Sequence, residues 1–148
     1  MTRWLLLLAS TAALAQTPDP RVDWSASWSN PTTLELSGRV EDGWHVYSLT
    51  QRPGGPIPLR ISIDDNPTAS LAGPPSGSRP ETRQDPSFNL QTEFYTSAFS
   101  VQVPIHFKSG AGSGSKLIPV SIRFQTCSIR ECKPPKTIHL SVPIEVAS

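Results

Sequence analysis

The sequence predicts an all-β fold, an antiparallel sandwich, on the strength of two observations. Apolar residues alternate with polar ones repeatedly along the chain, which is the period of a strand with one buried face. Sixteen prolines and nine glycines leave no uninterrupted stretch with the 3.6-residue period of an amphipathic helix. Strands bounded by turn residues, with no helix between them, indicate two packed antiparallel sheets.

Five runs carry the alternation. Their apolar positions are Leu34, Leu36 and Val40; Leu59, Ile61 and Ile63; Phe99, Val101, Val103, Ile105 and Phe107; Ile118, Val120, Ile122 and Phe124; and Ile138, Leu140, Val142, Ile144 and Val146. Weaker strands are expected at 22–28 and 44–49. The total of seven or eight strands predicts an immunoglobulin-like β-sandwich. The cysteine-tryptophan-cysteine spacing of true immunoglobulin domains is absent from the sequence.

Prolines and connections refine this prediction. Pro104, Pro119 and Pro143 occupy outward positions of the last three runs. Because proline cannot donate a ladder hydrogen bond, they predict strands at sheet edges. Residues 109–115, all glycine, serine and alanine, are expected to form a flexible hairpin tip. Residues 72–89 are rich in proline, glycine and charge without an apolar pattern, which predicts a structureless loop that is functional or mobile.

The N-terminal segment, residues 1–15, has the form of a secretory signal peptide. Arg3 precedes an apolar run that ends in the small-x-small sequence Ala13-Leu14-Ala15. The run is too short to span a bilayer stably, and no second apolar run follows it. Residues 16–148 are therefore expected to form one exported domain, periplasmic or otherwise outside the cytoplasm and not inserted in the membrane. Disulfides persist in such a compartment.

Composition excludes several function classes. The net charge is +1 and no basic run occurs, so neither nucleic acid nor an anionic membrane is an expected partner. The glycines lack the spacing of a nucleotide-binding loop, and no cofactor is expected.

The only two cysteines, Cys127 and Cys132, are separated by four residues and followed by Pro134-Pro135. A disulfide closing so short a loop stabilises a fold by about 2 kcal/mol, against about 4 kcal/mol for a loop of some sixty residues. The pair is therefore placed poorly for stability and well for exchange chemistry. Lys133 favours a thiolate beside it, whereas Glu131 opposes one.

Three function classes remain open on the residues alone. The first is a thiol–disulfide exchange protein, and the second is a non-catalytic binding module with a structural local disulfide. The third is a metal chaperone using both cysteines and a histidine. No histidine lies within motif distance of the cysteines, and the single methionine is in the predicted signal peptide, so no metal site is expected.

Three motifs, in this order, resemble the N-terminal periplasmic domain of the bacterial thiol:disulfide interchange protein DsbD. They are Gly43-Trp44-His45-Val46-Tyr47, then Glu93-Phe94-Tyr95, then the cysteine pair with its double proline. Together they span nearly all of residues 16–148. The resemblance implies an immunoglobulin-like sandwich, in agreement with the strand count. It also implies that the two cysteines cycle between dithiol and disulfide.

Carried over by position, the resemblance gives each residue a role. Cys127 and Cys132 would be the redox pair, with Cys132 attacking the partner. Glu93, Phe94 and Tyr95 would form a cap, with the Phe94 ring covering the sulfurs. His45 and Tyr47 would support the site. The alternative for Phe94 is an ordinary core residue, which its charged and polar neighbours disfavour. His45 and Tyr47 could equally be outward residues of a half-buried strand.

The sequence departs from the family pattern at two places. The best-known members have one more residue between the cysteines, and a tyrosine at the position of His45. The full-length family protein continues into a membrane electron carrier and a thioredoxin-like domain, whereas this sequence ends at Ser148. Whatever re-reduces the cysteines must therefore be a separate protein, or the reduction role is lost. The expected partners are periplasmic thioredoxin-like proteins or a membrane electron carrier, each reached through a transient mixed disulfide.

Overall fold

A computed structural model describes residues 21–148, and the predicted signal peptide lies outside them. These residues form an all-β fold, and among them no helix is long or apolar enough to cross a membrane. The strands are β1 (Val22–Asn30), β2 (Thr33–Val40), β3 (Trp44–Tyr47), β4 (Arg60–Ile63), β5 (Ala69–Leu71), β6 (Ser76–Gly77), β7 (Glu81–Asp85), β8 (Leu90–Tyr95), β9 (Ala98–Phe107), β10 (Gly114–Phe124), β11 (Thr126–Ser128) and β12 (Lys136–Val146).

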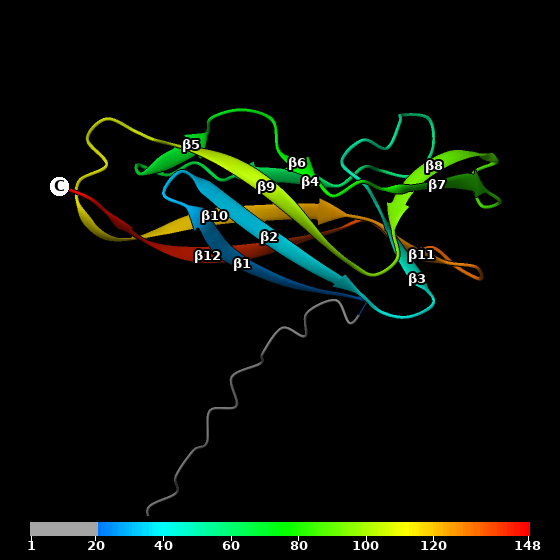
Figure 1. Ribbon diagram of the computed structural model, residues 1–148. Coiled ribbons are helices and arrows are strands. Elements are labelled where there is room, and N and C mark those ends of the chain that lie inside the picture. Colours follow the sequence, from blue (N-terminus) through cyan, green and yellow to red (C-terminus); the bar gives the residue numbers. More distant parts are fainter. Residues whose placement is uncertain (1–20) are drawn as a thin grey trace, which may run out of the picture.

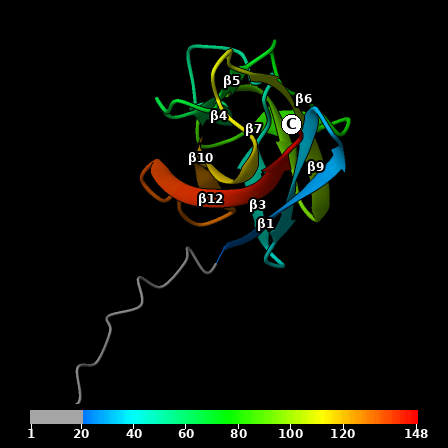
Figure 2. The same ribbon diagram turned by 90° about the vertical axis from the view of Figure 1, so that its left-hand side faces the viewer.

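Two antiparallel sheets form the body of the molecule. One has the order β1-β2-β9-β5, with β6 also paired to β9, and the other has the order β12-β10-β4. The end-on view shows β10 and β12 on one side of the fold and β1, β2 and β9 on another (Figure 2). The inward residues of the alternating runs pack between the sheets as one apolar cluster, called the main core below. Trp28 ties the sheets at their rim, since its Nε1 donates a 2.9 Å hydrogen bond to the carbonyl of Pro143.

A third sheet, ordered β11-β3-β8-β7, lies at one end of the body (Figure 1). The C-terminal residue lies at the opposite end. The predicted all-β, immunoglobulin-like class is confirmed. The described residues hold twelve strands rather than seven or eight, because the connections between the long strands form short strands of their own.

Two predicted connections are wrong. Residues 72–89 are not structureless, because β6 and β7 form there through backbone pairing with β9 and β8. The apolar pattern could not reveal them, since β7 is exposed except at Asp85. Residues 109–115 are not a hairpin tip, because β9 and β10 belong to different sheets.

The proline prediction is correct only for Pro143, which lies on the edge strand β12. Pro104 and Pro119 lie on the central strands β9 and β10. Each proline lies where the pairing with one neighbouring strand is interrupted. Strand β9 pairs with β6 before Pro104 and with β5 after it. Strand β4 ends opposite residue 120, next to Pro119. A missing N–H is therefore tolerated at a local break in the ladder as well as at an edge.

Candidate functional site

The cysteine loop begins on the short strand β11 of the third sheet. Cys127 and Cys132 form a disulfide, and a backbone hydrogen bond of 2.9 Å from Lys133 to Thr126 closes the base of the loop. Cys127 is 1% exposed, whereas Cys132 is half-buried. The two cysteines are thus unequally exposed, and Cys132 is the one that an approaching molecule meets first.

Strand register brings the predicted aromatic residues to the disulfide. Cys127 lies opposite His45 in the β11–β3 pair, and Tyr47 lies opposite Phe94 in the β3–β8 pair. Because side chains on a strand alternate with period two, His45 and Tyr47 share one face of β3. Tyr47, Phe94 and Cys127 form a buried cluster against which Phe88 and Cys132 pack, called the disulfide cluster below.

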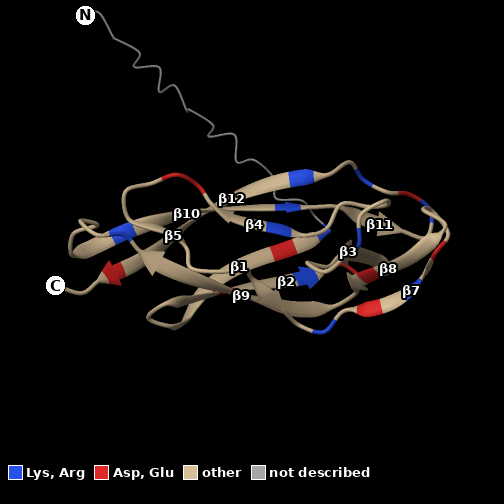
Figure 3. Cartoon of the chain, turned by 90° about the horizontal axis from the view of Figure 1, so that it is seen from above, with Lys and Arg blue, Asp and Glu red and all other residues tan. Residues whose placement is uncertain are grey.

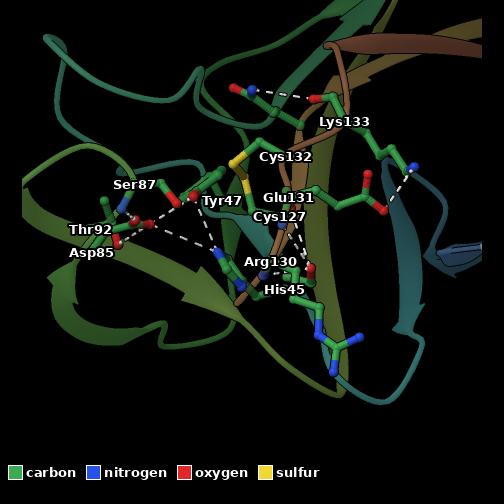
Figure 4. Close-up of a disulfide and its surroundings, with 12 residues drawn as sticks. His45, Tyr47, Asp85, Ser87, Thr92, Cys127, Arg130, Glu131, Cys132 and Lys133 are labelled. Atoms are coloured by element: carbon green, nitrogen blue, oxygen red, sulfur yellow. Dashed lines mark hydrogen bonds and ion pairs between the residues drawn. A yellow bond between two sulfur atoms is a disulfide. The ribbon is translucent and has the colours of Figure 1, made fainter.

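Hydrogen bonds link His45, Tyr47 and Asp85 beside this cluster (Figure 4), and Arg83 extends this chain at the His45 end. Arg83 donates from Nη2 to Nδ1 of His45 at 3.2 Å. Arginine can only donate, so Nδ1 is an acceptor and the neutral imidazole carries its hydrogen on Nε2. Nε2 then donates to the Tyr47 hydroxyl at 3.1 Å, and that hydroxyl donates to Oδ2 of Asp85 at 2.8 Å.

The environment fixes the protonation of His45 and Tyr47 at neutral pH. Burial, helped by the charge of Arg83 and opposed by that of Asp85, lowers the pKa of His45 to about 4. Burial also raises the pKa of Tyr47, and its hydrogen bond to Asp85 adds to that effect. His45 is therefore neutral and Tyr47 remains a phenol that can donate.

Asp85 is the buried acceptor at the end of the chain, with 3% of its surface exposed. Besides the bond from Tyr47, it accepts one from the Thr92 hydroxyl at 3.4 Å and one from the Ser87 amide at 2.8 Å. The last of these is the side-chain turn that aspartate favours. Buried charge is tolerated where donors surround it, which is the case here.

Phe94 lies beneath Arg83. The guanidinium carbon is 4.2 Å from the centre of the Phe94 ring, and the His45 and Phe94 rings are 5.1 Å apart. Phe94 is 1% exposed and lies on strand β8. It is thus a buried residue, as the alternative interpretation held, but it packs in the disulfide cluster and not in the main core.

The structure brings together five of the seven predicted site residues: Cys127, Cys132, Phe94, His45 and Tyr47. Both His45 and Tyr47 are buried, so they are not outward residues of a half-buried strand.

The other two predicted residues alternate to the opposite face of β8. Tyr95 packs in the main core, stacked on Phe99 at 4.3 Å, and its hydroxyl donates to the carbonyl of Ser78. Glu93 receives no side-chain hydrogen bond in the described part of the chain, although its backbone amide donates to Gln51 at 2.7 Å.

The sequence interpretation missed Arg83 and Asp85. Both lie on β7, within the segment predicted to be structureless. One signal could have indicated Asp85, since the sequence Asp85-Pro86-Ser87 is typical of an aspartate turn. Residues 21–148 contain no group of three or more histidine, cysteine or acidic side chains arranged to hold a metal ion.

Comparison with known proteins gives one family and one fold. Residues 12–143 match the family model described as thiol:disulfide interchange protein DsbD, N-terminal. The reduced DsbD N-terminal domain of Neisseria meningitidis is 16% identical over 88% of this chain and 94% of that chain, with a TM-score of 0.60. A complex between the DsbD and PilB N-terminal domains of that organism gives 16% identity, 88% coverage of both chains and a TM-score of 0.58. No curated protein matches the sequence.

Proposed function

The chain belongs to the DsbD N-terminal family, and from that premise we propose that it is a thiol–disulfide exchange protein that works through Cys127 and Cys132. The observation that carries this proposal is the unequal burial of a bonded cysteine pair at the end of a rigid sandwich. A short local bridge contributes little to stability, whereas a half-buried cysteine beside a fully buried one suits a two-step exchange.

The proposed reaction starts from the reduced pair and an oxidised partner. The Cys132 thiolate attacks one sulfur of the partner's disulfide, that bond breaks, and the partner's other cysteine leaves as a thiolate. The Cys127 thiol then gives its proton to the solvent, and the resulting thiolate attacks the Cys132 sulfur. The mixed disulfide bond breaks, a new Cys127–Cys132 disulfide forms, and the partner's first cysteine leaves as a thiolate. The partner has gained two electrons, and its two thiolates take up protons from the solvent, which had received the protons of Cys132 and Cys127.

The surroundings of the pair support these assignments. Cys127 packs behind Phe94 and Tyr47, where a partner sulfur has little access, so Cys132 is the better candidate for the first attack. Lys133 follows Cys132, although its Nζ also pairs with Glu131 at 3.1 Å. Phe94, held under Arg83, would exclude small thiols until a docking partner displaces it.

The finer parts of the proposal concern place and partners. The protein would act in the periplasm after cleavage near Ala15, as one domain from residue 16 to residue 148. It would pass reducing equivalents between a membrane electron carrier and thioredoxin-like proteins by mixed disulfides. The DsbD domain from Neisseria meningitidis that shares this fold forms a complex with the PilB N-terminal domain, which is the kind of partner we expect here.

A redox titration of the folded protein tests the function. A structural disulfide in a secreted protein has a potential below about −300 mV, and a working exchange pair lies above that value. We expect the Cys127–Cys132 pair to fall in the higher range and to open in millimolar dithiothreitol while the sandwich stays folded. A bridge that survives this treatment would be a structural staple, the alternative function of a non-catalytic binding module.

Two serine variants test which sulfur attacks. Each is offered a small activated disulfide at neutral pH, and formation of the mixed disulfide is followed by mass spectrometry. Cys127→Ser, which retains Cys132, should react at least tenfold faster than Cys132→Ser. Equal rates, or the reverse order, would remove the assignment of Cys132.

A further inference from the structure

The cysteine loop exposes a large apolar side chain. Ile129 is 88% exposed, and among residues 21–148 the only other exposed large hydrophobic residue is Leu117, at 63%. A single exposed apolar residue is ordinary on a protein surface. Ile129, however, lies between the two redox cysteines, two residues after Cys127 and three before Cys132.

Ser128 holds the loop in one conformation. Its hydroxyl oxygen accepts hydrogen bonds from the backbone amides of Arg130 at 3.1 Å and Glu131 at 3.2 Å. Its own amide donates to the Glu131 carbonyl at 2.7 Å. These bonds close a tight turn with Ile129 at its tip. The β-branched side chain is itself restricted, so little freedom remains to be lost when a partner covers it.

The charges around Ile129 do not form a field of one sign. Glu131 is paired with Lys133, whose ammonium also lies 5.6 Å from the centre of the Trp44 ring. Arg130 extends away from the disulfide (Figure 4). Acidic and basic residues are mixed at the end of the molecule that holds β11, β3, β8 and β7 (Figure 3). An apolar residue surrounded by a mixed polar rim is the usual anatomy of a protein interface.

We propose that Ile129 is the docking anchor for the protein partner: it enters an apolar patch beside the reactive cysteine of a thioredoxin-like domain. This inference rests on the proposed function. A mixed disulfide joins the partner's sulfur directly to Cys132, so the partner's surface must cover the adjacent tip of the loop. A rigid apolar side chain that becomes desolvated there has the properties of an interface hot spot.

The test compares a protein substrate with a small one. The reduced protein is mixed with the oxidised PilB N-terminal domain of Neisseria meningitidis, or with bis(2-hydroxyethyl) disulfide. Exchange is stopped with acid and scored by thiol alkylation. Ile129→Ala should lower kcat/KM for the PilB domain at least tenfold, mainly through KM, and change the rate with the small disulfide less than twofold. Ile129→Leu should recover most of the loss.

Leu117→Ala is the matched control, because it removes the other exposed apolar side chain, on β10 in the main body of the fold. It should leave both rates unchanged. Equal losses with both substrates, or a wild-type rate with the PilB domain for Ile129→Ala, would overturn the anchor. A wild-type protein that exchanges with neither disulfide would refute the proposed function itself, which is a separate outcome.

Discussion

The main core and the disulfide cluster are both buried, yet they are built on different principles. The main core is made of hydrophobic side chains, and the two long-stranded sheets supply most of it by simple alternation. The disulfide cluster holds aromatic rings and two cysteines, and beside them hydrogen bonds run from the exposed Arg83 through the buried His45 and Tyr47 to Asp85. An apolar core maximises stability, whereas a polar chain in a small cluster contributes less stability and fixes particular atoms. The difference separates a region that holds the fold from a region that, under the proposed function, would control access to the disulfide.

The largest effect should come from exchanging one aromatic residue in each region for alanine. Phe99→Ala in the main core should lower the free energy of unfolding by about 3–5 kcal/mol, because the well-packed residues around it cannot move far enough to fill the cavity that the substitution leaves. Phe94→Ala should cost less, since the exposed Arg83 can move into the space.

The oxidation rates should run the other way. Reduced Phe94→Ala should react faster with a small oxidant, and folded Phe99→Ala should react at the wild-type rate. Chemical denaturation and stopped-flow oxidation measure the two quantities. A Phe94 variant that is strongly destabilised but oxidised at the wild-type rate would make Phe94 an ordinary core residue and end the contrast.

The second effect concerns the pH dependence of stability that His45, beside the disulfide cluster, should produce. The pKa of His45 falls from 6.5 to about 4 on folding, so the unfolded chain binds an extra proton between these values. This contribution to stability is complete above pH 6.5 and is lost as the pH falls towards 4, with an upper limit of about 3 kcal/mol. His45→Gln should flatten the stability profile in that window. A profile that is the same for wild type and variant would show that His45 does not titrate as its contacts indicate.

A third effect tests the buried carboxylate. Asp85→Ala leaves the Tyr47 and Thr92 hydroxyls without their acceptor and should cost about 2 kcal/mol. Asp64 makes a matched comparison, because it accepts hydrogen bonds from Ser121 but is part-buried on the surface of the main sandwich. Asp64→Ala should cost less than about 1 kcal/mol. Equal losses of unfolding free energy in the two variants would mean that the buried acceptor Asp85 contributes no more to stability than the part-buried acceptor Asp64.

The smallest effect is expected at Arg83. A cation over an aromatic ring at an exposed site contributes about 0.5–1 kcal/mol, so Arg83→Ala should speed oxidation of the reduced pair only two- to fivefold. Arg21 lies over the Trp44 ring at 4.4 Å and provides the matched control away from Phe94. Arg21→Ala should not change the oxidation rate. The same increase in oxidation rate for both variants would show that the increase comes from a general loss of stability and not from the contact between Arg83 and Phe94.

The main core could be predicted from the sequence because alternation is a local signal. The alternation within one short segment is enough to indicate strand β10, and its inward residues are all buried: Ile118, Val120, Ile122 and Phe124. The disulfide cluster depends instead on register between short strands. Nothing near Cys127 in the sequence indicates that it lies opposite His45, and only the family resemblance brought the two together.

Arg83 and Asp85 lay beyond both kinds of reasoning. Their strand β7 is exposed except at Asp85, so no apolar period marks it, and it forms only because β8 provides a pairing edge. Asp85 is buried by contacts with Tyr47 and Thr92, which are 38 and 7 residues away in the sequence. A polar residue buried by long-range partners resembles a surface residue until the fold is known.

The position of the C-terminal residue, at the opposite end from the disulfide, has a practical consequence. An affinity tag, a fluorophore or a linker to a solid support attached after Ser148 would stand far from Cys132 and Ile129. The protein could then be displayed on a sensor chip or an electrode with its disulfide-bearing end, the proposed site of exchange, facing the solution. In that orientation a captured partner and the electrons that it exchanges could be recorded from the same surface.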